Sequence, residues 1–170
     1  MVKALGAMLV IGGGLWWGLS RSRELSRRRA AIEAWAEALA LLEGELAFSL
    51  PAMPELLEGL SRRSRSPARE ALSAIQANMD RLGEKSFSQL WREALEAHGE
   101  ALAPEDLEQL CRLGGLLSRR GWEDQREAAE AVRISLLAQA EQLREELRRE
   151  GKSYGTLGLA LGAFLAILLM

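Results

Sequence analysis

Apolar residues are concentrated at the two ends of this 170-residue chain, whereas the middle mixes apolar and charged positions. Residues 4–19 and residues 154–170 carry no charge, and clustered basic residues flank each stretch on the side that faces the middle of the chain. Such stretches are typical of membrane-spanning helices with snorkelling basic flanks. We therefore expect an N-terminal transmembrane anchor at residues 1–20 and a C-terminal transmembrane helix at residues 153–170.

Each end has a rival interpretation. The first stretch resembles a signal peptide in length, but no A-x-A cleavage site follows, and five arginines within residues 21–29 oppose translocation of what comes next. The last stretch has the hydrophobicity of a buried core helix, but it lacks a polar face to meet water. The membrane interpretation is favoured at both ends.

The distribution of basic residues also predicts the topology. Because both clusters flank the central region, the positive-inside rule places residues 21–152 on the cytoplasmic side, as a cytoplasmic helical domain. Small residues spaced G-x-x-x-G occur in both predicted anchors and permit close packing of membrane helices. They are Gly14 and Gly18 in the first anchor, and Gly158 and Gly162 in the second.

Two long helices are predicted where the middle of the chain joins the anchors. The first covers residues 22–48 and has its apolar positions at alternating steps of three and four, the spacing of a seam along another helix. Those positions are Leu25, Ile32, Trp35, Leu39, Leu42 and Leu46. The other begins near Trp122, runs into the C-terminal anchor, and has an apolar face at Ala129, Val132, Leu136, Leu143 and Leu147. We expect these two helices to pack antiparallel.

Four short helices are predicted between the long ones. They cover about residues 54–63, 67–82, 86–98 and 104–117. Their starts are indicated by Pro54, by Ser66 as a cap before Pro67, by a Ser86/Gln89 capping box, and by Pro104. The last of them contains Gly114 and Gly115, which cost helix stability, so a closely packed neighbour is expected to compensate.

The amino-acid composition supports an all-α fold. The chain has only nine β-branched residues (three Val, five Ile and one Thr), against 33 Leu and 26 Ala. A sheet core needs many more strand-forming side chains, whereas good helix formers are abundant here. We therefore expect a membrane-anchored helical bundle of two long antiparallel helices and several short ones.

Few residues are suited to catalysis or to binding a metal. A net charge of −2 gives no electrostatic basis for nucleic-acid binding. A single His and a single Cys exclude a Cys/His zinc site and an intramolecular disulfide. His98 is interpreted as a helix C-terminal residue and Cys111 as a small core residue. Glu43 and Glu45 point to different sides of a helix and do not form an acid/base pair. We expect no enzyme activity, no cofactor and no small-molecule substrate.

Arginines gather at two connections between the predicted helices. One interpretation is a solvated surface; the other is an electrostatic patch for an acidic protein partner, because these arginines lie away from lipid phosphates. The candidate partner-interface residues are Arg62, Arg63, Arg65, Arg69, Arg119 and Arg120.

Four stretches of the sequence resemble a known family over the whole chain and in the same order. They are LGAMLVIGGGLWWG, LLEGELAFSLPAMPELLEGL, CRLGGLLSRRGWEDQ and KSYGTLGLALGAFLAILLM. In these stretches the chain is similar to the stage III sporulation protein AB family of endospore-forming bacteria, a reduced relative of the type II secretion system F platform proteins. An LE-x-E segment of the family is matched by Leu42, Glu43 and Glu45. An LG…LG…Q segment is matched by Leu113, Gly114 and Gln125, but its second Leu-Gly is replaced by Arg120-Gly121.

The resemblance implies a component of the mother-cell-to-forespore channel, anchored in the mother-cell-derived membrane around the forespore with its helical domain in the mother-cell cytoplasm. It implies a docking platform for a stage III sporulation AA-type secretion ATPase, with Gln125 added to the candidate interface. Other stage III sporulation membrane subunits are further expected partners. The alternative is a structural membrane tether that recruits polytopic channel subunits through its two transmembrane helices.

Overall fold

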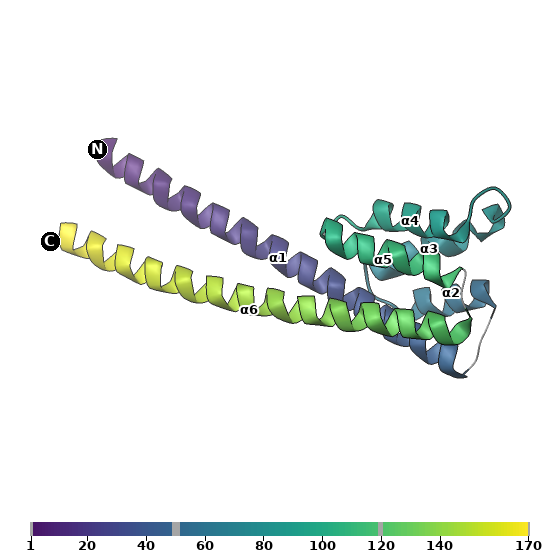
Figure 1. Ribbon diagram of the computed structural model, residues 1–170. Coiled ribbons are helices and arrows are strands. Elements are labelled where there is room, and N and C mark those ends of the chain that lie inside the picture. Colours follow the sequence, from purple (N-terminus) through teal and green to yellow (C-terminus); the bar gives the residue numbers. More distant parts are fainter. Residues whose placement is uncertain (1, 49–51, 119–120, 170) are drawn as a thin grey trace. The chain divides into compact units, whose positions relative to one another are not determined.

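The computed structural model describes the backbone of residues 2–48, 52–118 and 121–169, and the side chains of residues 20–48, 52–118 and 121–149. Every regular element in these ranges is helical, which confirms the all-α prediction (Figure 1). The elements are α1 (Val2–Phe48), α2 (Met53–Arg63), α3 (Ala68–Ala77), the 3-10 helix η1 (Met79–Arg81), α4 (Phe87–His98), α5 (Pro104–Leu117) and α6 (Trp122–Leu169).

The chain divides into two compact units. The first, here called the terminal unit, consists of Met1–Arg27 and Glu141–Met170, and the second, here called the bundle unit, is Arg28–Ala140. Within the part of the chain that was described, no helix combines the length and apolarity needed to cross a membrane. The side chains of both predicted anchors lie outside that part, except for Ser20.

Most predicted helix ends agree with the structure. Ser86 caps α4 by accepting a hydrogen bond from the Gln89 amide, while the Gln89 side chain accepts one from the Ser86 amide, which confirms the capping box. Pro104 opens α5 and Pro54 lies in the first turn of α2, positions where a missing amide proton costs nothing.

The predicted helix over residues 67–82 is partly wrong. Ser66 is not its cap: α3 begins at Ala68, and Pro67 occupies the position before it. α3 also ends early, at Ala77, because the Asn78 side chain bonds to the Ala74 carbonyl and the chain then turns into η1. Leu82, placed on the apolar face by its spacing, is 43% exposed. Local side-chain bonding by Asn thus ends a helix that the apolar spacing alone would continue.

The bundle unit is built on a buried seam along α1. All six apolar positions predicted for residues 22–48 are buried, five of them in this unit, and Ile32, Trp35 and Leu39 are at most 1% exposed. The α1 and α6 segments of this unit run antiparallel (Figure 1). They are joined at 2.6 Å by an ion pair from Arg133 Nε to Glu43 Oε1. The short helices α2 to α5 cover the seam and complete the core.

Candidate protein-binding surface

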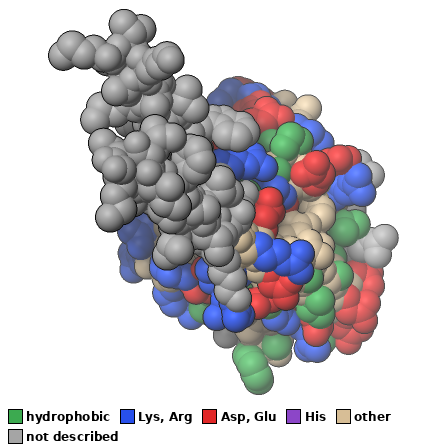
Figure 2. Space-filling model, turned by 90° about the vertical axis from the view of Figure 1, so that its left-hand side faces the viewer, with side chains coloured by type: hydrophobic (Ala, Val, Ile, Leu, Met, Phe, Trp, Pro, Cys, Tyr) green, Lys and Arg blue, Asp and Glu red, His purple; other side chains and the backbone are tan. Residues whose placement is uncertain are grey.

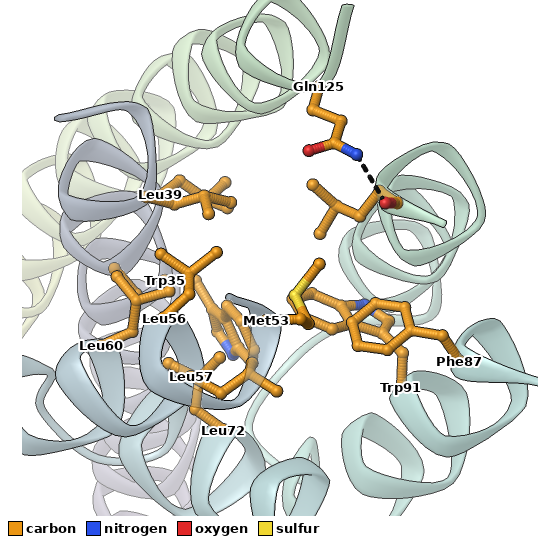
Figure 3. Close-up of a pocket in the computed structure, with 13 residues that line it drawn as sticks. Trp35, Leu39, Met53, Leu56, Leu57, Leu60, Leu72, Phe87, Trp91 and Gln125 are labelled. Carbon is orange, nitrogen blue, oxygen red and sulfur yellow. Dashed lines mark hydrogen bonds between the residues drawn. The ribbon is translucent and has the colours of Figure 1, made fainter. Parts of the chain in front are cut away.

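The centre of the bundle unit is closed to ligands. Thirteen residues from all six α-helices converge there, among them Trp35, Leu57, Leu72 and Trp91 (Figure 3). The space they leave is about 10 Å³, which is room for a single water molecule. Among the described side chains, no group of three or more His, Cys, Asp or Glu could hold a metal ion. The centre of the bundle unit is therefore a packed apolar core.

Trp91 ties three helices together in this core. Its ring lies 6.1 Å from the Trp35 ring on α1 and 5.8 Å from the Phe87 ring, measured between centroids. Its indole N–H donates a 2.8 Å hydrogen bond to the Leu110 carbonyl on α5. Gly114 allows this approach, because a Cβ atom there would lie 2.5 Å from Cγ of Trp91. The expectation of a closely packed neighbour is confirmed at Gly114.

The same expectation is wrong at Gly115. A Cβ atom at this position would meet nothing within 4 Å, so no neighbour requires a glycine there. Gly115 instead lines an open groove between α4 and α5, whose volume is about 660 Å³. The groove is lined by Ser88, Gln89 and Arg92 from α4, and by Cys111, Arg112, Gly115 and Leu116 from α5.

A buried ion pair joins α1 to the start of α5. The Asp106 side chain is fully buried, and its carboxylate accepts hydrogen bonds from Arg28 Nε at 2.8 Å and Arg28 Nη2 at 3.1 Å. It also accepts one from the Ala103 amide at 3.0 Å, which caps the N-terminus of α5. The sequence did not indicate this pair, because its partners are 78 residues apart.

The arginines predicted as a partner patch around residues 61–69 have partners inside the bundle unit. Arg62 pairs with Glu58 at 2.5 Å, and Arg63 pairs with Glu45 of α1. Arg65 makes a two-point contact with Glu37 of α1, with Nε 2.8 Å from Oε2. Arg69 donates to the Ser64 carbonyl at 2.9 Å. These contacts reduce the net positive charge of the cluster, and they attach the α2–α3 connection to α1.

The other predicted site residues are only partly placed. Gln125 donates a 2.8 Å hydrogen bond to the Leu117 carbonyl at the end of α5 (Figure 3). Arg119 and Arg120 lie outside the described residues. The predicted packing glycines fall on segments of α1 and α6 whose side-chain environment also lies outside them, and these are Gly14, Gly18, Gly158 and Gly162.

The LE-x-E and LG…LG…Q segments of the family resemblance contain residues that hold the bundle unit together. Glu43 and Glu45 point to different neighbours, as predicted, since Glu43 bonds Arg133 of α6 and Glu45 bonds Arg63 of α2. Leu42 and Leu113 are buried. Gly114 allows Trp91 to pack against α5, and Gln125 bonds the Leu117 carbonyl at the end of α5. These residues shape the scaffold on which a binding surface would lie.

Acidic and basic side chains are interspersed over the described surface that faces the viewer in Figure 2. Most arginines of the bundle unit have a carboxylate within ion-pair distance. Arg92 and Arg126 are exposed, and within the described ranges no carboxylate lies within 4 Å of either guanidinium; of these two, Arg92 lines the groove between α4 and α5. Sequence reasoning missed Arg92, because it stands between Trp91 and Glu93 rather than in a basic run.

Cys111 is a small core residue, as predicted, and the residue is 5% exposed. Burial raises the pKa of its thiol above the ordinary value. A raised pKa disfavours the reactive thiolate in the folded chain, so alkylation by iodoacetamide at pH 8 should be at least about tenfold slower than in denaturant. The same shift predicts that stability declines as the pH rises above about 8.5, where an unfolded thiol ionises.

The measurement is simple because Cys111 is the only cysteine in the chain. Mass spectrometry of the labelled protein gives the alkylation rate directly. Equal rates in the native and denatured chain would contradict the burial of the thiol in the folded chain.

Comparisons with known proteins place this scaffold in a family. The chain is similar to a solved structure of "Stage III sporulation protein AB (SpoIIIAB)", with a TM-score of 0.63 and 18% identity, over 72% of this chain and 97% of that one. At this identity the likeness shows a shared fold. A search of curated protein sequences finds no match. Residues 3–170 match the family described as stage III sporulation protein AB, and the chain therefore belongs to the stage III sporulation protein AB family of sporulation proteins.

Proposed function

We propose that this protein is a non-enzymatic membrane platform of the mother-cell-to-forespore channel. In this proposal, residues 1–20 and 153–170 anchor it in the mother-cell-derived membrane around the forespore. Residues 21–152 face the mother-cell cytoplasm and dock a stage III sporulation AA-type secretion ATPase. Membership of the family supports a role in sporulation. The more specific platform role is proposed from the resemblance of this family to secretion platform proteins.

The observation that carries this proposal is the continuity of the two long helices. α1 runs unbroken from Val2 to Phe48 and α6 from Trp122 to Leu169. Each therefore passes from a predicted anchor into the bundle unit without a loop. A docking domain that is joined to the membrane by two helices transmits force to the membrane better than a domain joined by flexible linkers.

The closed centre of the bundle unit favours binding over catalysis. Substrate pockets usually measure about 300 Å³ or more, far above the space left here. The hollow between α4 and α5 is open to solvent and suits a protein segment.

The proposal predicts that the full chain, reconstituted in lipid nanodiscs, binds the purified ATPase with a Kd in about the micromolar range, with or without nucleotide. Empty nanodiscs are the control, and fluorescence anisotropy of the labelled ATPase is the measurement. Absence of binding at concentrations up to about 100 μM would exclude a stable docking role.

The structural tether is the competing function, and glycine substitutions separate the two. Gly14→Leu with Gly158→Leu would block close helix packing in the membrane while leaving the bundle unit unchanged. Under the platform proposal this double variant still binds the ATPase. Loss of sporulation with ATPase binding fully retained would instead favour the tether.

A further inference from the structure

The groove between α4 and α5 combines a hollow shape with an exposed arginine on its α4 wall. Its only charged lining residues are Arg92 and Arg112, one on each wall, and the other lining side chains are neutral. Arg112 is held by Glu108 at 2.5 Å, and this hydrogen bond also lowers the pKa of the Glu108 carboxyl. Arg92 has no such partner within the described ranges, so its guanidinium is available to another molecule.

The polar groups around Arg92 suit a carboxylate. A guanidinium presents several N–H donors in a planar fork that matches a carboxylate in two-point geometry. Gln89 and Ser88 lie on the same wall, one turn before Arg92; both are neutral, and both also bond Ser86 at the start of α4. Leu116 supplies an apolar contact on the opposite wall. An extended or helical segment bearing Asp or Glu would therefore satisfy both the shape and the charge of the groove.

The floor of the groove allows the segment to come close. Gly115 contributes no side chain, and a Cβ atom there would meet nothing within 4 Å. Cys111 lies one turn before it and is buried. Gly115 is partly exposed, so a docking segment could approach α5 at this position without displacing a side chain.

We propose that the α4–α5 groove is a docking site for an acidic segment of the partner ATPase, with Arg92 as its principal contact. This inference rests on the proposed function, because it names the surface by which the platform would hold that partner. It differs from the arginine patch expected from the sequence, whose described members already have partners within the chain.

Binding of the ATPase to the full chain in nanodiscs tests the groove. Arg92→Glu reverses the only unpaired charge there, and Gly115→Leu fills the hollow with a side chain that has space at its base. Each is expected to weaken binding by at least about tenfold, because like charge or lost volume excludes the acidic segment. The matched control is Arg126→Glu, an exposed arginine of α6 with no ion pair in the described ranges, which should change the affinity by less than about twofold.

A cross-link identifies the occupant. Arg92→Lys keeps the positive charge and places an amine in the groove, which a carbodiimide can couple to a carboxylate of the bound partner with loss of water. The background is low because the chain contains only three lysines. Peptide mass spectrometry should find the new amine joined to an Asp or Glu of the ATPase, and the wild-type chain should lack that product.

The outcomes separate the inference from the proposed function. If wild type binds the ATPase but Arg92→Glu binds equally well, the groove assignment is wrong and the platform role stands. If Arg126→Glu weakens binding as much as Arg92→Glu, the effect is general electrostatics and the groove assignment is again overturned. If wild type does not bind at all, the proposed function fails and the groove inference fails with it.

Discussion

Replacing Asp106 with alanine is expected to lower the free energy of unfolding of the bundle unit by about 3 kcal/mol, at the lower end of what breaking a buried ion pair costs. The substitution removes the Asp106 carboxylate, which Arg28 contacts at 2.8 Å, and leaves the Ala103 amide without its cap. The lower end applies because Arg28 is 30% exposed and can regain some hydration. Urea unfolding, followed by the fluorescence of the buried Trp35 and Trp91, gives the value.

Two further variants divide this effect into its parts. Asp106→Asn keeps an oxygen that can accept from the Ala103 amide, so it should be less damaging than alanine by about 1 kcal/mol, the usual contribution of a helix cap. Glu105→Gln is the matched control, since Glu105 is 77% exposed and 3.8 Å from Arg28, and it should cost less than about 0.5 kcal/mol. A loss at Asp106 no greater than that at Glu105 would show that the pair does not hold α5 to α1.

The adjacent glycines of α5 are expected to respond to alanine with opposite signs. Gly114→Ala places a Cβ atom against the buried Trp91 ring, 2.5 Å from Cγ and 2.9 Å from Cβ, where neither can move away easily. Overpacking of this kind costs about 1–3 kcal/mol, which exceeds the gain in helix propensity. Gly115→Ala meets nothing and should stabilise the chain by up to about 1 kcal/mol, the difference in propensity between Gly and Ala.

These two variants control for each other, because they lie next to each other in one helix and make the same chemical change. Thermal melting by circular dichroism, run on both in parallel, measures the sign of each effect. If both variants gained stability, the Trp91 ring would have to be free to move, and the description of Trp91 as the junction of α1, α4 and α5 would be wrong.

The features that sequence reasoning predicted correctly depend on residues close together in the chain. The capping box of α4 needs only Ser86 and Gln89, which are three residues apart, and the buried face of α1 follows from a regular spacing. The same reasoning failed at residues 66–82, where the Asn78 side chain competes for a backbone carbonyl and ends α3 early. Apolar spacing predicts which face a helix buries, but it does not predict that a side chain will bond a backbone carbonyl and end the helix.

The features that it missed depend on residues far apart. Asp106 and Arg28 are separated by 78 residues, so the sequence around neither residue predicts that they form a buried ion pair. The arginines near residue 63 looked like a basic patch because Glu37 and Glu45 of α1 belong to a different part of the sequence. Arg92, in contrast, attracts no attention in the sequence, and only the packing of α4 on α5 gives it a groove.

The platform account depends most directly on the side of the membrane that residues 21–152 face. Ser73 lies exposed on α3, and a Ser73→Cys variant in a Cys111→Ala background offers one accessible thiol in that region. We expect this thiol to react with a membrane-impermeant maleimide only after the mother-cell membrane has been opened to admit the reagent to the cytoplasm. Reaction from the opposite side, with the membrane intact, would contradict the topology and exclude docking of a cytoplasmic ATPase.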